Sequence, residues 1–488
     1  MIGSVRVSPE LPDADITSAG AVTGLDPGDP ARSAEVIAAG DRRVEGMRRA
    51  GRPFAAVARR DAVVDHDTWT LEVDFVLAPG PRARFAAPTV EGTDTVNQRL
   101  LDRVAGQLEN RDYSPETQDR VRRDLLGLGV FGTVRARAAE RLDADGRLPV
   151  AFTVIDRPRR AVGGTVAYET RYGFTGTAYW EHRNLFGAAE RLRLEATVGR
   201  LGGGEVSDVN GRIAANFRKP WIFGRNMTLV SELALLRERL DAYDRDGGTA
   251  TVGIETKPDP RLTLGVSAVA DISRVTEFDL PDDRRYSVKL FGALGTAVFD
   301  NTDSPLDPSR GYRLNGLVQP LFSFSEDSGY FTRLRVGGSA YFDFTNGDRG
   351  SVLAVRGLVG AIPGGNLGVV PPHYRFFAGG GGSVRGYDFQ SIGPRRADDS
   401  PRGGLSLVEA SIELRQRVSG PWGVALFLDA GTAGADVSPD FGSMKLGAGA
   451  GVRYATPIGP IRADVGIPLS SVPGSSGYGL YVGIGQAF

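Results

Sequence analysis

Residues 191–199 read RLRLEATVG, and they alternate strictly between two kinds of side chain. Successive side chains of a β-strand point to opposite faces, so the apolar residues share one face and the arginines and the glutamate share the other. The same alternation recurs in Arg333–Phe342 and Ile461–Ile467. This pattern indicates a β-barrel that encloses water and is bounded by lipid. A soluble β-sandwich or a propeller also alternates, but it would not usually keep so many arginines along one face.

Short alternating segments of this kind continue to the C-terminus and predict a transmembrane antiparallel barrel of about sixteen strands, an even number that suits closure. The expected strands lie near 162–170, 175–183, 191–200, 209–218, 226–239, 247–257, 261–273, 284–299, 310–324, 329–344, 350–361, 404–416, 422–430, 443–456, 459–468 and 478–488. The last strand is expected to end at Phe488, so that the barrel closes with the C-terminus. One connection, 363–402, is too long for a simple hairpin, and we expect it to be functional.

The N-terminal third of the chain mixes helix and strand patterns. In 80–160 a strand is followed by an apolar stripe at helical spacing, a second helix that begins after Ser114, and two strands. Residues 1–79 repeat this order, with a helical pair broken at Gly40. We therefore predict two copies of one small α+β unit, 1–79 and 80–160, before an all-β barrel at 161–488. Two unrelated small α+β domains are the alternative.

Composition excludes several classes of site. The chain has no cysteine, which rules out disulfides and thiolate metal sites, and its three histidines lie far apart, so no metal site is expected. A net charge of -1 gives no reason to expect a nucleic-acid partner. No nucleophile elbow or serine–histidine pair is evident. We therefore expect no enzyme activity and no cofactor.

The long connection carries the sequence RFFAGGGGSVRGYD at residues 375–388. Its glycines are not followed by the Gly-Lys-Ser/Thr of a phosphate-binding loop. We interpret the segment as a flexible tongue whose Arg385 can bind a carboxylate inside the barrel in bidentate fashion. Alternation on neighbouring strands places Glu413 and Asp429 on the lumenal face, which makes them the candidate partners. The alternative is that all three are ordinary solvated lumen charges.

These motifs resemble those of the BamA/TamA superfamily of outer-membrane assembly proteins. The matching residues are Val384, Arg385, Gly386 and Tyr387 in the loop, and Ser411–Glu413 and Phe427–Gly431 on the strands. The two N-terminal units resemble POTRA domains. Within the superfamily, RFFAGG at 375–380 and TPIGPI at 456–461 are most similar to TamA, the translocation and assembly module barrel. The resemblance implies that the loop arginine pairs with the lumenal acids, here Glu413 and Asp429.

The resemblance also implies a location and an activity. The barrel is expected in the outer membrane of a Gram-negative bacterium, surrounded by the lipid bilayer, with the POTRA units in the periplasm and the extracellular loop 363–402 folded into the lumen. It is expected to insert or export client outer-membrane proteins such as autotransporters, with a TamB-like inner-membrane-anchored protein as candidate partner. TamA-like proteins have a signal peptide and three POTRA units, so either Met1 is an internal start or both lie upstream. A two-partner secretion pore and a BamA-like insertase are the alternatives.

Glycines at both ends of the barrel sequence suggest where it opens. Glycine weakens a strand because it leaves little to pack and loses more entropy on folding. The predicted lateral seam consists of Gly163, Gly164, Gly479, Gly483, Gly485 and Phe488. An opened seam would offer unpaired backbone groups to an incoming client strand. The alternative is that these glycines merely relieve crowding where the barrel closes.

Overall fold

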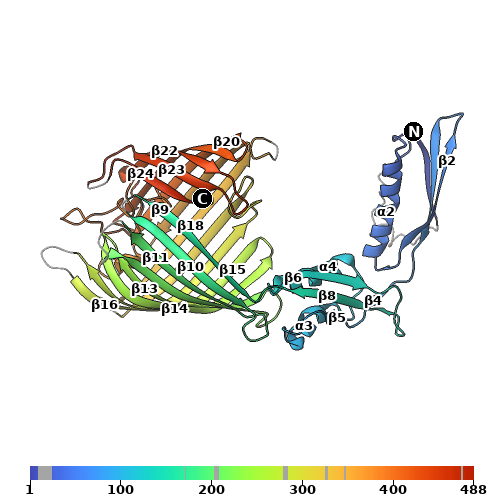
Figure 1. Ribbon diagram of the computed structural model, residues 1–488, viewed down its shortest axis with the longest axis horizontal. Coiled ribbons are helices and arrows are strands. Elements are labelled where there is room, and N and C mark those ends of the chain that lie inside the picture. Colours follow the sequence, from blue (N-terminus) through green and yellow to red (C-terminus); the bar gives the residue numbers. More distant parts are fainter. Residues whose placement is uncertain are drawn as a thin grey trace. The chain divides into compact units, whose positions relative to one another are not determined.

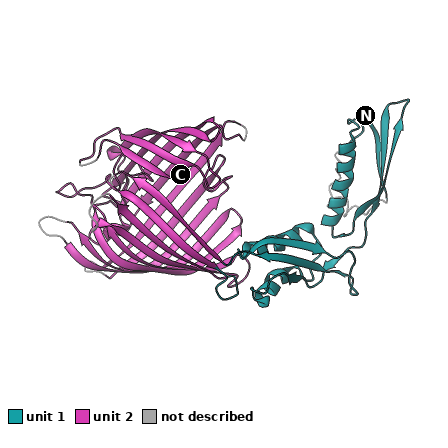
Figure 2. Ribbon diagram, viewed as in Figure 1, with its two compact units in different colours: residues 1–159, 183–189 teal, residues 160–182, 190–488 magenta. Residues whose placement is uncertain are grey.

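The computed structural model describes residues 1–8, 25–170, 172–202, 208–278, 284–324, 328–345, 348–473 and 476–488. The chain divides into two compact units (Figure 2). The first comprises residues 1–159 with the turn 183–189, and the second comprises 160–182 and 190–488. Within the described ranges, no helix is both long enough and apolar enough to cross a membrane.

The first unit begins with a three-stranded sheet in the order β1-β3-β2 (Figure 1). Its elements are β1 (Ile2–Ser8), α2 (Ser33–Arg49), β2 (Ala56–Asp65) and β3 (Thr70–Ala78). Strand β1 runs parallel to β3, and β2 runs antiparallel to it. Val36 and Met47 of the helix are buried in one apolar cluster with Phe75 of β3, so burial of one helix face against the sheet holds this part together.

The predicted helix break at Gly40 is wrong, because α2 continues through it as one helix of 17 residues. A Cβ atom at Gly40 would lie 3.0 Å from the ring of Phe75 and 3.1 Å from the guanidinium of Arg60. The glycine therefore lets the helix approach the sheet closely. Glycine weakens a helix, but tertiary packing against β3 outweighs that intrinsic preference here.

A second three-stranded sheet, in the order β5-β8-β6, follows in the same unit. The elements of this part are β4 (Arg84–Phe85), β5 (Thr89–Glu91), α3 (Gln98–Ala105), η1 (Gly106–Leu108), α4 (Pro115–Gly127), β6 (Phe131–Ala138), β7 (Arg147–Leu148) and β8 (Val150–Asp156). As predicted, Ser114 caps α4: its hydroxyl accepts a hydrogen bond from the backbone N–H of Thr117 at 3.4 Å. The single short strand predicted near 82–90 is two strands, because β4 pairs with β7 whereas β5 pairs with β8.

The second unit is a closed antiparallel barrel in which sixteen strands follow one another in chain order and the last pairs with the first (Figure 1). The predicted strand number is therefore confirmed. The strands are β9 (Arg160–Glu169), β10 (Gly173–Arg183), β11 (Arg191–Leu201), β12 (Asn210–Pro220), β13 (Met227–Arg239), β14 (Tyr243–Asp259), β15 (Leu262–Glu277), β16 (Arg284–Asp300), β17 (Gly311–Ser323), β18 (Gly329–Asp343), β19 (Ser351–Ala361), β20 (Ser406–Ser419), β21 (Trp422–Gly434), β22 (Lys445–Tyr454), β23 (Ile461–Pro468) and β24 (Gly479–Ile484).

Side chains alternate between the two faces of this barrel as the sequence predicts. On β20, Ile412 is 44% exposed whereas the adjacent Glu413 is fully buried. On β21, Leu428 is 44% exposed whereas Asp429 is 1% exposed. The outward face is thus apolar and the inward face carries the charges, which is the distribution that a lipid-bounded barrel requires.

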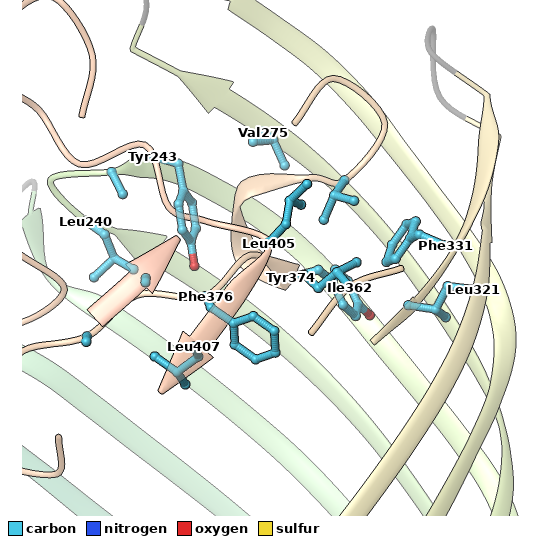
Figure 3. Close-up of a cluster of buried hydrophobic side chains, with 14 of the residues drawn as sticks. Leu240, Tyr243, Val275, Leu321, Phe331, Ile362, Tyr374, Phe376, Leu405 and Leu407 are labelled. Atoms are coloured by element: carbon cyan, nitrogen blue, oxygen red, sulfur yellow. The ribbon is translucent and has the colours of Figure 1, made fainter. Parts of the chain in front are cut away.

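The long connection between β19 and β20 lies inside the barrel. Its Tyr374 and Phe376 are buried in an apolar cluster with Phe331 of β18 and Leu407 of β20 (Figure 3). Arg375 also contacts the wall: its Nη1 forms an ion pair with Oε1 of Glu277 on β15 at 2.5 Å. The loop therefore occupies part of the lumen and packs against its wall at this level.

The predicted last strand, 478–488, is too long. Strand β24 ends at Ile484 and the next residue, Gly485, has a φ of +88°, a left-handed conformation that glycine adopts readily. The chain turns there, and Gln486 accepts a hydrogen bond from Nε of Arg453 at 2.9 Å. Phe488 consequently lies in the lumen and not in the closing strand. Its neighbours are Tyr341, Val352 and Ala354.

Candidate functional site

The candidate site is the place where the lumenal loop meets the barrel wall. Arg385 lies on the loop, Glu413 on β20 and Asp429 on β21, and the exposed fraction of each is 2% or less. Strands β20 and β21 are neighbours, with Ser411 directly opposite Asp429. Both acids occupy inward positions of the strand alternation, so the local pattern of these strands aims them at the loop.

The structure brings Arg385, Glu413 and Asp429 together. The Arg385 guanidinium donates to both carboxylate oxygens of Asp429, from Nε at 2.7 Å and from Nη2 at 3.0 Å. Its Nη1 donates to Glu413 at 2.7 Å, and its backbone N–H donates to Asp429 at 3.1 Å. The guanidinium carbon also lies 3.4 Å from the ring centroid of Phe427. This bidentate, stacked geometry suits arginine and not lysine.

The ion pairs extend beyond the predicted residues. Among the described residues, the lumenal ion cluster comprises four arginines and three acids: Arg385, Arg415, Arg453, Arg462, Glu413, Asp429 and Asp464. Asp464 is fully buried; it accepts from Arg453 at 2.5 Å and from Arg462 at 3.0 Å. Each acid thereby has at least one guanidinium partner, as buried carboxylates require. The sequence signal for the additional members is their inward position in the alternation of β20, β22 and β23.

Glycines let the loop lie against the wall. Gly386 has a φ of +99°, and a Cβ atom there would lie 2.6 Å from the backbone carbon of Ile467. Gly431 makes room for Val384, since a Cβ on Gly431 would lie 2.7 Å from that side chain. The hydroxyl of Tyr387 lies 2.8 Å from the carbonyl oxygen of Leu446. All four residues of the loop motif are therefore in contact with the wall or its ion cluster.

The closing strand pair is held at few positions. Strands β24 and β9 are in register at two positions, Tyr481 with Glu169 and Val482 with Tyr168. Hydrogen bonds between Thr170 and Leu480 extend this contact by one step. Strands β15 and β16, in contrast, pair along their whole length. The seam is therefore much shorter than an ordinary strand pair of this barrel, and less backbone hydrogen bonding must be broken to part it.

The structure does not bring the two groups of seam glycines together. Gly163 and Gly164 lie opposite Tyr179 and Ala178 of β10, because β24 reaches only the other end of β9. A Cβ atom on Gly163 would lie 2.5 Å from the hydroxyl of Tyr179, so that glycine makes room for a ring. On β24, Gly479 and Gly483 lie opposite Gly466 and Arg462 of β23. The seam is therefore short, and the predicted glycines of its two strands do not face one another.

Residues 184–488, more than half of the chain, match the model of the Omp85 superfamily domain. The chain belongs to the Omp85 superfamily. The solved structure of BamA from Haemophilus ducreyi lacking POTRA domains 1–3 is similar over 99% of both chains, with a TM-score of 0.79 at 18% identity. CdiB from Acinetobacter baumannii is similar over 99% of this chain and 90% of its own, with a TM-score of 0.58 at 11% identity. These likenesses show a shared fold.

Curated relatives of this Omp85 protein include outer membrane protein assembly factor BamA of Neorickettsia risticii (strain Illinois), 26% identical over 422 residues. That match covers 81% of this chain and 54% of the relative. The chloroplastic outer envelope protein 80 of Arabidopsis thaliana is 24% identical, covering 76% of this chain and 54% of its own. The chain thus spans about half the length of these relatives. The predicted superfamily is confirmed, while the finer resemblance to TamA stays a prediction.

Proposed function

We propose that this protein inserts β-barrel client proteins into the outer membrane of a Gram-negative bacterium through the seam between β9 and β24. The observation that carries the proposal is the two-position pairing of the seam, whereas β15 and β16 pair along their whole length. Relatives that bear the name of an outer membrane protein assembly factor support it.

The seam already presents an edge to which a client strand can add. Residues Arg160–Ala167 of β9 have no β24 partner in the described part of the chain. Along this edge Val162 is 77% exposed and Val166 is 65% exposed. Unpaired N–H and C=O groups of an edge strand template another strand by β-augmentation. This mechanism uses backbone hydrogen bonds alone, so we propose a non-enzymatic protein that needs no cofactor.

We further propose that the first unit contains two POTRA domains, 1–79 and 80–160, which lie in the periplasm. Support comes from the two helix-and-sheet arrangements described above and from their place before an Omp85 barrel. The motifs at 375–380 and 456–461 support the more specific proposal of a TamA-like protein with autotransporter clients and a TamB-like partner. Lipid surrounds the barrel in this proposal, because its outward face is apolar.

A disulfide across the seam tests the proposal. The chain has no cysteine, so Tyr168→Cys with Val482→Cys forms a single defined pair at opposed positions. We expect the cross-linked protein in liposomes to lose insertion of a purified client, scored by its heat-modifiable folded form, and to regain it on reduction. Val252→Cys with Ala268→Cys, an outward pair on β14 and β15, is the matched control and should stay active. Normal insertion by a fully cross-linked seam would overturn the proposal.

A secretion pore of the two-partner type is the second candidate, because a barrel that follows two small helix-and-sheet arrangements also fits that class. A pore passes its substrate through the lumen, so the loop would have to move while the seam stays closed. The same seam disulfide separates the two functions. Export that continues through a cross-linked seam, together with lost export when the loop is tethered to the wall, would identify the pore.

A further inference from the structure

The lumenal loop reaches both strands of the seam. We propose that residues 380–390, here called the clasp segment, hold the seam closed from inside the barrel, with Glu169 and Tyr481 as the positioning residues. Release of the loop and opening of the seam are then one coupled event. This inference deepens the proposed function, on which its biological purpose rests, but the clasp itself is a property of the barrel without any client.

On the β9 side, the clasp segment binds through its glycine run. The backbone N–H of Gly381 donates to a carboxylate oxygen of Glu169 at 3.2 Å. A Cβ atom on Gly380 would lie 2.9 Å from the same oxygen, so the run passes close to β9. Just beyond β9, the ring of Tyr172 lies 4.9 Å from that of Phe389, centroid to centroid. The segment is thus attached to β9 and to its hairpin.

On the β24 side, the attachment is the hydroxyl of Tyr481. It accepts a hydrogen bond from the backbone N–H of Gly386 at 2.9 Å and donates to the carbonyl oxygen of Tyr387 at 3.2 Å. Tyr481 is 3% exposed, so these hydrogen bonds are shielded from water. A Cβ atom on Gly381 would lie 2.6 Å from the Tyr481 ring, which places the glycine run against both seam strands.

The two attachments lie at the same level of the barrel. Tyr481 and Glu169 are directly opposite each other in the seam, at one of its two paired positions. If β24 leaves β9, the clasp segment cannot keep both partners. The segment is also anchored elsewhere, because Arg385, adjacent to Gly386, is bound to Asp429 of β21. Parting the seam therefore costs the clasp contacts on one side in addition to the few strand hydrogen bonds.

Loss of the clasp contacts should increase the open fraction of the seam by an amount that the hydrogen bonds allow us to estimate. A buried hydrogen bond between neutral groups changes an equilibrium by a factor of roughly three to ten. Loss of the Tyr481 hydroxyl removes two of them, so the open fraction of the seam should rise about tenfold if opening breaks the Tyr481 side. Loss of the Glu169 carboxylate removes one, so the rise should be about three- to tenfold if opening breaks the Glu169 side. Coupling between two sites is reciprocal, so seam opening by a client should loosen the loop to the same extent.

Spin labels on the full chain in liposomes, without a client, measure the seam directly. Phe174, Tyr168, Val482, Ala463 and Val452 form one row across β10, β9, β24, β23 and β22. Labels at outward Phe174→Cys and Val452→Cys span four strand spacings, about 19 Å, when the seam is closed. Parting the seam breaks the attachment on one side, so either Tyr481→Phe or Glu169→Ala should add a longer-distance population about three- to tenfold larger than that of the parent chain, and the variant that responds identifies that side. Tyr312→Phe, at an outward tyrosine of β17, should not add this population.

Unchanged distances in both variants, relative to Tyr312→Phe, would overturn the clasp. Glu169→Gln is the milder second variant, and retained heat-modifiable mobility shows that each barrel is folded. The outcome is independent of the seam disulfide test. Wider distances in either variant together with full insertion by a cross-linked seam would keep the clasp and remove the proposed function. Unchanged distances in both variants together with lost insertion by the cross-linked seam would keep the proposed function and remove the clasp.

Discussion

At the scale of single residues, Arg385 is the side chain that ties the lumenal loop to the acids of the barrel wall. A buried ion pair that loses one partner costs about 3–5 kcal/mol, because the remaining charges stay buried without compensation. Arg385→Glu should therefore loosen the lumenal loop, raise its protease sensitivity and impair client insertion. Adding Asp429→Arg should restore part of the protease resistance and part of the client insertion. Arg417→Glu, at an exposed position of β20, is the control. An Arg385→Glu protein with unaltered proteolysis and insertion would disprove that the Arg385 ion pairs hold the lumenal loop in place.

Arg385, Glu413 and Asp429 could be selected from sequence because strand alternation gives the direction of each side chain and the loop motif points to one arginine. Asp464 and Arg453 could not be selected. Alternation places them on the lumenal face with many other charges, and it does not say which lumenal charges lie close together. That depends on the register of β20 to β23 and on the path of the loop, both of which are set by tertiary structure.

At the scale of elements, the N-terminus of α4 in the first unit is capped by the side chain of Ser114. The Ser114 hydroxyl satisfies one of the backbone N–H groups that the first turn leaves unpaired. Ser114→Ala should destabilise the helix by about 1 kcal/mol. Hydrogen exchange of the α4 amides should then be roughly fivefold faster. Ser114→Thr, which keeps the capping oxygen and the hydroxyl that donates to Glu116, should exchange at the parent rate. Equal exchange in Ser114→Ala would show that the cap contributes nothing.

The barrel strands could be predicted because alternation with period two is a local property that survives in the fold. Two of the predictions that were wrong involve glycine. At Gly40 the sequence suggests a helix end, but the missing side chain serves close packing on Phe75. At Gly485 the sequence suggests strand continuation, but a positive φ turns the chain into the lumen. A glycine allows several conformations, and only its neighbours in space decide between them.

At the scale of the whole molecule, the central claim is that a client strand pairs with the free edge of β9. Direct cross-linking tests it. A single cysteine at outward Val166 of β9 is combined with cysteines scanned along the terminal strand of a client arrested during insertion. Phe291→Cys, outward on the interior strand β16, is the control.

If the client strand pairs in one register, Val166→Cys should form a disulfide mainly with the one client position directly opposite it, and weakly with the positions two residues away. The client positions between these should not react, because side chains of a strand alternate in direction. Phe291→Cys should form none. Cross-links that are equally frequent at both positions, or absent from Val166→Cys while the client still inserts, would contradict the account.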